Sequence, residues 1–167
     1  RQLPLYSLET KTGVRRFSFL GFSLQYEMIY SNVLNMLDLA GIPLHAAERT
    51  EVDPFVVGGG PCVYNVEPIA DFFDFFVVGE GEEVLLEVVD VYEAWQAEGR
   101  TDGRQGFLRR LLAVDGIYVP SFYTPRYAAD GSFRALVPRA EEARPVIYKR
   151  VVKDMDKVPS VAHPIVP

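Results

Sequence analysis

Cysteine is almost absent, with Cys62 the one thiol in a chain of 167 residues. A single cysteine excludes a disulfide within the chain and any metal site made of several of its own cysteines. Such sparse use of cysteine is typical of a reducing compartment, so we expect a cytoplasmic protein. The histidines, His45 and His163, are remote from Cys62 in sequence. We therefore expect Cys62 to be a structural thiol rather than a catalytic nucleophile.

Clusters of basic residues and long apolar runs are also missing. The 17 lysines and arginines are spread along the chain and outnumbered by 23 aspartates and glutamates, for a net charge of −6. Because proteins neutralise nucleic-acid phosphates with clustered cations, we expect no nucleic-acid partner. No apolar run approaches the ~20 residues needed to cross a bilayer, and the N-terminus has no signal-peptide core. The absence of an initiator methionine predicts a piece of a longer chain.

Two short apolar runs, each followed at once by glycine, dominate the middle of the sequence. Phe55–Val57 leads into Gly58-Gly59-Gly60-Pro61, and Phe75–Val78 leads into Gly79-Glu80-Gly81. This layout is typical of an α/β sheet whose loops gather at the carboxyl ends of its strands, where open parallel sheets place their ligands. Glycine suits such loops because it accepts positive φ and lets the backbone come close to a ligand.

The other patterns complete an α/β fold. Residues 17–24 are almost continuously apolar, which is typical of a strand covered on both faces. Apolar residues spaced by four and three predict a helix over 25–40 that ends at Gly41, just before Pro43. We also expect a short strand at 3–9, a short helix at 65–70, and helices at 82–95 and 107–112.

After Gly116 the pattern changes to short strands separated by turn signals. Asp130-Gly131 predicts a hairpin turn, and the prolines after residue 158 predict an extended linker. The strands are expected at 117–120, 122–127, 133–137 and 146–152. We thus divide the chain into an α/β domain at 1–115, a β-rich extension at 116–157 and a linker at 158–167.

The glycine turns each allow more than one interpretation. Gly79–Val84 partly matches a dinucleotide fingerprint, but a pyrophosphate would lie beside Glu80, Glu82 and Glu83, where like charges repel. A tight turn with carboxylates at a helix N-terminus is therefore favoured over a nucleotide site. Gly58–Pro61 lacks the lysine and the Ser/Thr of a phosphate loop. It is equally consistent with close packing and with a surface for a flat ligand.

With these motifs in view, the chain resembles the cobalamin-binding-like N-terminal domain of radical S-adenosylmethionine (radical SAM) proteins. The likeness is to an uncharacterised bacterial family of radical SAM iron–sulfur oxidoreductases, and it covers residues 3 to about 167. The combination of GGGP at 58–61 with D-x-x-VVGEGEE at 74–83 carries it. The resemblance implies an open, mostly parallel, flavodoxin-like sheet, to which the turn signals after Gly116 add a small C-terminal β-hairpin extension. It also implies that the strand ends line a crevice for the nucleotide tail of a corrinoid.

The resemblance also assigns candidate site residues. Ser23 with Gln25, and the double glycine at 58–59, would line the corrinoid crevice, while the turn at 79–82 would face the catalytic barrel. The candidate cofactor-binding residues are Ser23, Gln25, Gly58, Gly59, Gly60, Pro61, Gly79, Glu80, Gly81 and Glu82. No residue is assigned a catalytic or metal-binding role.

Two family motifs have no match in this chain. The D-x-H-x-x-G segment that precedes the first helix of the fold is absent. We therefore expect the first strand and helix to be missing and the sheet to have an exposed edge or a gap. The C-x-x-x-C-x-x-C motif that binds a [4Fe–4S] cluster is also absent, so we expect no radical chemistry from this chain alone.

Three hypotheses for function follow. The leading one, implied by the resemblance, is an accessory domain that covers its own radical SAM barrel, in a parent enzyme that holds a [4Fe–4S] cluster and S-adenosylmethionine, with cobalamin as a candidate cofactor. The alternative is a docking module with the same fold and no cofactor. The third is a nucleotide-binding domain. An exposed sheet edge would also allow a homo-oligomer.

Overall fold

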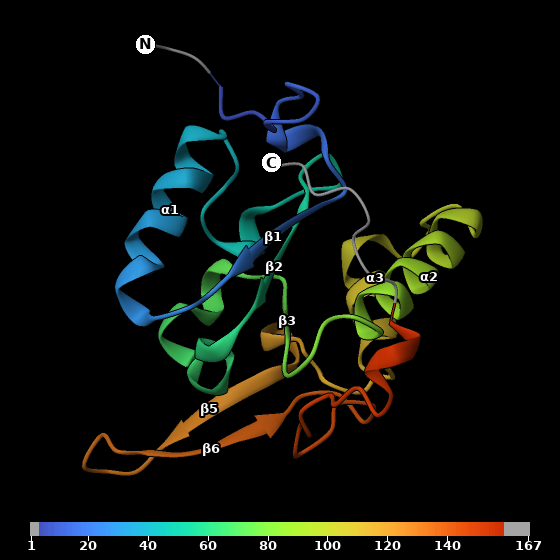
Figure 1. Ribbon diagram of the computed structural model, residues 1–167. Coiled ribbons are helices and arrows are strands. Elements are labelled where there is room, and N and C mark those ends of the chain that lie inside the picture. The colour runs from blue at the N-terminus through green and yellow to red at the C-terminus, as the bar shows by residue number, and fades with distance from the viewer. Residues whose placement is uncertain (1–3, 159–167) are drawn as a thin grey trace.

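The computed structural model describes residues 4–158 and contains a four-stranded sheet with the order β1-β2-β3-β4 (Figure 1). The strands β1 (Phe19–Ser23), β2 (Phe55–Gly59) and β3 (Phe75–Val77) run parallel, and β4 (Ile117–Tyr118) is antiparallel to β3. The open, mostly parallel α/β sheet expected from the sequence is therefore confirmed. The central strands are apolar throughout because both of their faces are covered.

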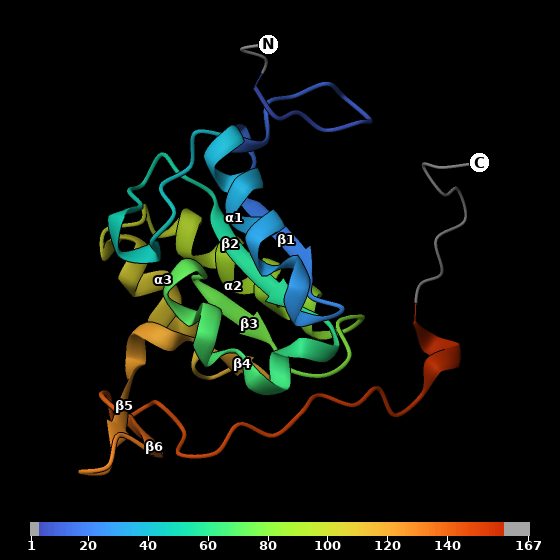
Figure 2. The same cartoon turned by 90° about the vertical axis from the view of Figure 1, so that its left-hand side faces the viewer.

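Helices cover the sheet on both sides (Figures 1 and 2). The helix α1 (Tyr30–Leu39) lies on one face, and α2 (Val84–Ala97) and α3 (Gly103–Leu111) lie on the other. Val33 and Leu37 of α1 are buried, as the spacing of four predicts. On the opposite face the Phe55 and Phe107 rings lie 4.5 Å apart, centroid to centroid.

A buried ion network joins the amino ends of β2 and β3. The carboxylate of Asp74 accepts hydrogen bonds from Arg49 at 2.8 Å and from Arg104 at 2.9 Å. It also accepts one from the backbone N–H of Val56, at 2.7 Å. The side chains of Arg49 and Asp74 are 0% and 2% exposed. Both charges are thus withdrawn from water and compensated by hydrogen bonds, as buried ions must be.

A two-stranded hairpin stands apart from the main sheet. It consists of β5 (Tyr123–Tyr127) and β6 (Phe133–Pro138), and it projects beyond the end of β3 in Figure 1. The predicted Asp130-Gly131 turn is confirmed, with Gly131 at φ +82°. After β6 the chain runs along the underside of the sheet toward the opposite end of the molecule (Figure 2).

Residues 17–24 do not form a strand covered on both faces, so that expectation is wrong. The observed β1 lies at the edge of the sheet, and Gly21 and Ser23 are exposed. Because β1 pairs directly with β2 in the register Ser23↔Gly59, the sheet has no internal gap. The outer side of β1 is an exposed edge, where no strand of the described residues pairs with it.

Several predicted elements are shorter than expected or lie elsewhere. The helix α1 begins at Tyr30 rather than at 25, because Tyr26 is extended and a 3₁₀ turn intervenes. Residues 4–9 contribute one bridge, Tyr6 to Gly13, instead of a strand, and 146–152 likewise contribute only the bridge from Gly79 to Arg150. The strand expected at 117–120 is shorter and joins the main sheet as β4. The helix expected at 65–70 is a 3₁₀ helix at Glu67–Phe72. Residues 159–167 of the predicted linker lie outside the described residues.

No helix among residues 4–158 is long and apolar enough to cross a membrane.

Candidate functional site

The carboxyl ends of β1 and β2 are joined by their backbones. The N–H of Leu24 donates to the carbonyl oxygen of Gly59 at 2.6 Å, and the N–H of Cys62 donates to the carbonyl oxygen of Leu24 at 3.0 Å. The Leu24 side chain is fully buried and Cys62 is half-buried. This junction fixes the start of the glycine loop against the end of β1.

The three glycines of the loop have different surroundings. A Cβ on Gly58 would collide with the ring of Phe76, and a Cβ on Gly60 would lie 2.9 Å from the carbonyl oxygen of Leu24. Gly60 also has φ +95°, a conformation that favours glycine. A Cβ on Gly59 would meet nothing within 4 Å. Close packing therefore accounts for Gly58 and Gly60, whereas Gly59 has open space beside its backbone.

An exposed polar pair lies at the end of β1. The side-chain amide of Gln25 donates to the hydroxyl of Ser23 at 2.9 Å, and both residues are exposed. Since Ser23 is in register with Gly59, this polar pair and Gly59 lie next to each other at the carboxyl ends of β1 and β2. The two features together offer hydrogen-bonding groups beside an unobstructed stretch of backbone.

The second glycine turn holds a distant segment, residues 148–152, which we call the strap. The N–H of Arg150 donates to the carbonyl oxygen of Val78 at 2.8 Å, and the N–H of Glu80 donates to the carbonyl oxygen of Arg150 at 3.1 Å. The Glu80 carboxylate accepts a hydrogen bond from the N–H of Val152. Gly79 has φ +105°, and a Cβ there would collide with the Arg150 backbone. Glycine is therefore required at position 79 for the strap to pack against this turn.

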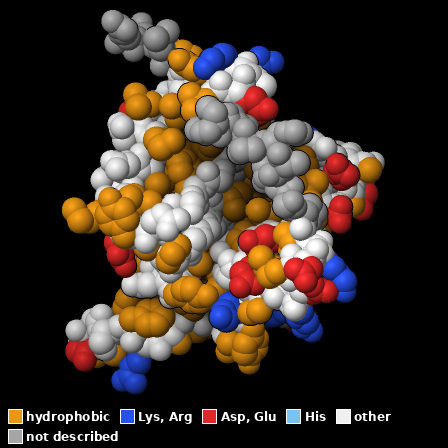
Figure 3. Space-filling model, in the orientation of Figure 1, with side chains coloured by type: hydrophobic (Ala, Val, Ile, Leu, Met, Phe, Trp, Pro, Cys, Tyr) orange, Lys and Arg blue, Asp and Glu red, His pale blue; other side chains and the backbone are white. Residues whose placement is uncertain are grey.

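Charged side chains hold the strap against the start of α2. The guanidinium of Arg150 pairs with the carboxylates of Glu87 and Glu83, and hydrogen bonding to Glu87 raises the pKa of Arg150. A Cβ on Gly116 would lie 2.9 Å from the Arg150 Cβ, so the strap is also closely packed from that side. Figure 3 shows acidic and basic side chains side by side on this part of the surface, at lower right.

A cavity of about 350 Å³ lies between the glycine loop and the strap. Its lining residues are Gly60, Pro61, Tyr64, Gly79, Glu80, Lys149 and Arg150. Four of the ten predicted site residues thus line one hollow, while Ser23 and Gln25 at the end of β1 and Gly59 at the end of β2 are not part of its lining. Tyr64, Lys149 and Arg150 also line it and were not predicted. For Lys149 and Arg150 the reason is that no local sequence pattern connects the strap to the turn at residue 79.

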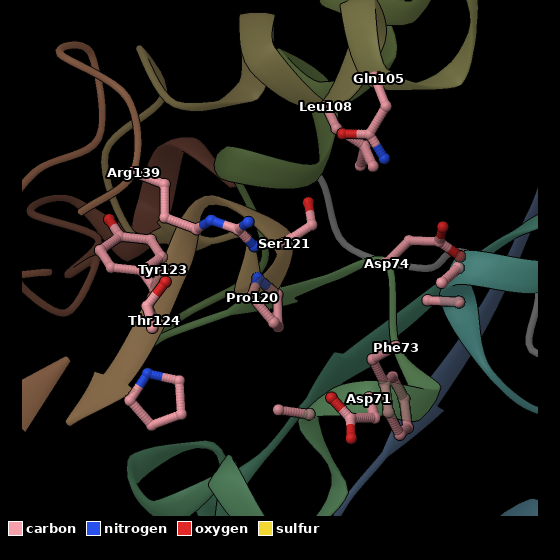
Figure 4. Close-up of a pocket in the computed structure, with 14 residues that line it drawn as sticks. Asp71, Phe73, Asp74, Gln105, Leu108, Pro120, Ser121, Tyr123, Thr124 and Arg139 are labelled. Atoms are coloured by element: carbon pink, nitrogen blue, oxygen red, sulfur yellow. The ribbon is translucent and has the colours of Figure 1, made fainter. Parts of the chain in front are cut away.

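A second hollow, of about 390 Å³, lies at the opposite end of β3 (Figure 4). Asp71 comes from the 3₁₀ helix Glu67–Phe72, Asp74 directly precedes β3, Gln105 comes from α3, and Arg139 follows the hairpin. In Figure 4 the Arg139 side chain extends across the hollow toward Ser121. Among residues 4–158, no group of three or more His, Cys, Asp or Glu side chains is arranged to hold a metal ion.

The structure is an open, mostly parallel α/β sheet, a fold in which ligands commonly bind at the carboxyl ends of the strands. Residues 1–120 match the family described as radical SAM proteins, N-terminal. The chain belongs to this family. It therefore represents an N-terminal domain of a radical SAM protein, which confirms the resemblance in the sequence at the level of the family.

One relative among curated proteins extends this comparison. The chain is 37% identical over 90 residues to an uncharacterized protein of Methanocaldococcus jannaschii. The match covers 52% of this chain and 18% of the relative, so the chain spans less than a fifth of the length of that protein. No solved structure matches the chain.

Proposed function

We propose that this domain covers the open end of a radical SAM barrel, with the carboxyl ends of β1, β2 and β3 turned toward the barrel. The observation that carries the proposal is the strap, because residues 148–152 are bound to the Gly79 turn at the carboxyl end of β3. Iron–sulfur clusters need several cysteine thiolates, and this chain has one cysteine. The [4Fe–4S] cluster and S-adenosylmethionine would therefore be bound by the barrel, and the domain would act by shaping and shielding the site.

The substitution Gly79→Val, made in an intact radical SAM protein that contains this domain, tests the proposal. Valine would collide with the Arg150 backbone and would be strained at φ +105°, so the strap should detach. We expect trypsin to cleave after Lys149, Arg150 or Lys153 about tenfold faster, because cleavage follows local opening. The barrel should no longer be covered, and uncoupled cleavage of S-adenosylmethionine should increase.

Gly131→Val serves as the matched control, since this glycine also has positive φ but lies in the hairpin turn. It should leave cleavage at the strap unchanged. If Gly79→Val leaves it unchanged as well, the strap does not anchor the domain. Failure of the intact protein to acquire an oxygen-sensitive iron–sulfur absorbance after anaerobic reconstitution would refute the radical-enzyme assignment.

A corrinoid is the second candidate, and the open backbone at Gly59 favours it. The residues present fit the nucleotide tail of such a cofactor: Gly59 leaves room, and Ser23 and Gln25 offer exposed hydrogen-bonding groups. When bound, a corrinoid would supply a cobalt centre for alkyl or electron transfer. The chain's own contribution would be to hold the tail and orient the cofactor toward the barrel.

Titration with hydroxocobalamin, followed in the visible spectrum, tests corrinoid binding. We expect a saturable spectral change that Gly59→Val weakens by about tenfold, because the side chain would fill the open space. Gly13→Val is the control, since a Cβ there also meets nothing within 4 Å. No spectral change with the wild-type protein would favour the alternative, a docking module without a cofactor.

Nucleotide binding at the Gly79 turn is the least favoured function. The N–H of Glu80 already donates to the Arg150 carbonyl oxygen, so it is not free to bind a phosphate. Glu80, Glu82 and Glu83 lie in or directly after the same turn, and their negative charges would repel a pyrophosphate.

A further inference from the structure

The β5–β6 hairpin has one apolar face. Tyr123, Pro125 and Tyr127 alternate along β5, so their side chains share a face. On β6, Leu136 is in register with Pro125, and Phe133 is in register with Tyr127. All five side chains line the same hollow, which makes this the inner face of the hairpin.

Only the base of this face is covered. Tyr123 is 6% exposed, whereas Tyr127 is 62% and Phe133 is 54% exposed. The Tyr127 and Phe133 rings lie 6.2 Å apart, edge to face. Figure 3 shows hydrophobic side chains at the surface over the hairpin. An isolated two-stranded ribbon is only marginally stable in water, so an apolar face of this kind gains stability when a further segment covers it.

The opposite wall of the hollow is the 3₁₀ helix Glu67–Phe72. Glu67, Pro68 and Asp71 of this helix face the hairpin across a groove of about 560 Å³. The hydroxyl of Tyr118 lies at the base of the groove and donates to the Glu67 carboxylate at 2.6 Å. Burial raises the pKa of Tyr118, so its phenol stays protonated and keeps the Glu67 carboxylate oriented.

The groove is aromatic, rich in proline and negatively charged. Its lining is Asn65, Glu67, Pro68, Ala70, Asp71, Tyr118, Pro120, Tyr123, Pro125, Tyr127, Phe133 and Leu136. This lining contains two carboxylates and no lysine or arginine. Neither Glu67 nor Asp71 takes part in an ion pair within residues 4–158. A cationic occupant would therefore complement the charge of this groove.

We propose that the groove binds an extended segment of a partner protein that carries proline together with arginine or lysine. Proline-rich segments are pre-ordered in an extended helix and dock between exposed aromatic rings. A basic side chain would form an ion pair with Asp71 or Glu67. Its cation would also make cation–π contacts with the rings of Tyr127 and Phe133. The lining of this groove shares no residue with the hollow beside the strap, so this proposal can be tested separately from the barrel-covering function.

Binding can be measured by fluorescence anisotropy with a labelled peptide of repeating Pro-Pro-Arg, added to the 167-residue chain. We expect saturable binding that weakens with added salt, because it includes charge pairing. A peptide of repeating Pro-Pro-Glu should bind at least about tenfold more weakly. Equal binding of the two peptides would overturn the proposal, and so would the absence of saturable binding.

Variants locate the binding site. Tyr127→Ala should weaken binding of the Pro-Pro-Arg peptide by about tenfold, because exposed aromatic anchors dominate such contacts. Asp71→Asn should weaken it and reduce its dependence on salt. Tyr148→Ala is the matched control: Tyr148 is 78% exposed and lies in the strap, and its loss should leave binding unchanged. Equal effects of Tyr127→Ala and Tyr148→Ala would refute the assignment to the groove.

Two further measurements test the kind of occupant. Free arginine amide should not compete at concentrations comparable to the peptide, and full competition would identify a site for a small cation instead. The peptide should also bind an intact protein that contains this domain. If it binds the 167-residue chain but not the intact protein, another part of that protein already fills the groove, and the proposal of a separate partner is wrong.

Discussion

Asp74 compensates two buried guanidinium groups at the start of β3. Each of its carboxylate oxygens accepts from a different arginine, and the N–H of Val56 donates to one of them as well. Arg49 and Arg104 donate in turn to backbone carbonyl oxygens of the connections that lead into the sheet. One carboxylate thus ties three separate segments of the chain together.

We expect Asp74→Ala to reduce the free energy of unfolding by about 3–5 kcal/mol, because it leaves two buried cations without a counter-charge. Urea denaturation followed by Trp95 fluorescence measures the loss. The matched control is Asp71→Ala, an exposed carboxylate three residues earlier, which should change stability by less than about 0.5 kcal/mol. Similar losses for the two variants would mean that the ion network contributes little to the fold.

Among the elements, the strands β2 and β3 and the helices α2 and α3 could be predicted from short-range patterns. Their apolar residues repeat with the period of the element or fill strands that are buried on both faces. The strap and the place of β4 could not be predicted this way. The strap depends on Gly79 and Gly116, whose missing side chains let Arg150 approach. The place of β4 depends on its pairing with β3, and nothing in the local sequence identifies either partner.

The glycine loop shows the same limit within one element. The sequence gives no reason to distinguish Gly58, Gly59 and Gly60, but their surroundings in the folded chain differ. Phe76 fills the space beside Gly58, and the Leu24 backbone fills the space beside Gly60. Only the space beside Gly59 is open, which selects it from the three as the residue that can lie against a ligand.

At the scale of the whole molecule, acidic groups bring a dependence of stability on pH. Burial alone would raise the pKa of Asp53, but hydrogen bonds from Thr50 and Arg15 outweigh burial and lower it. A hydrogen bond from Arg110 lowers the pKa of Asp102. Since the folded pKa of each group lies below the unfolded value of about 3.9, the unfolded chain binds more protons in acid.

We therefore expect stability to be fully present above about pH 5 and to be lost as pH falls through the lowered folded pKa values. Urea denaturation at a series of pH values measures this loss. In Asp53→Asn the dependence should be shallower, because the buried carboxylate no longer titrates. A midpoint that stays constant from neutral pH to about pH 3 would contradict the assigned pKa directions.

The sequence by itself determined the fold class, the order of most elements and the family, because periodic burial and compact glycine motifs are encoded by neighbouring residues. The tertiary structure decided that Asp74 pairs with Arg49 and Arg104, that the strap closes on Gly79, and that the hairpin leaves an acidic aromatic groove. These contacts join residues that are far apart along the chain. Their formation depends on which backbones can approach one another, and only the packed molecule fixes that.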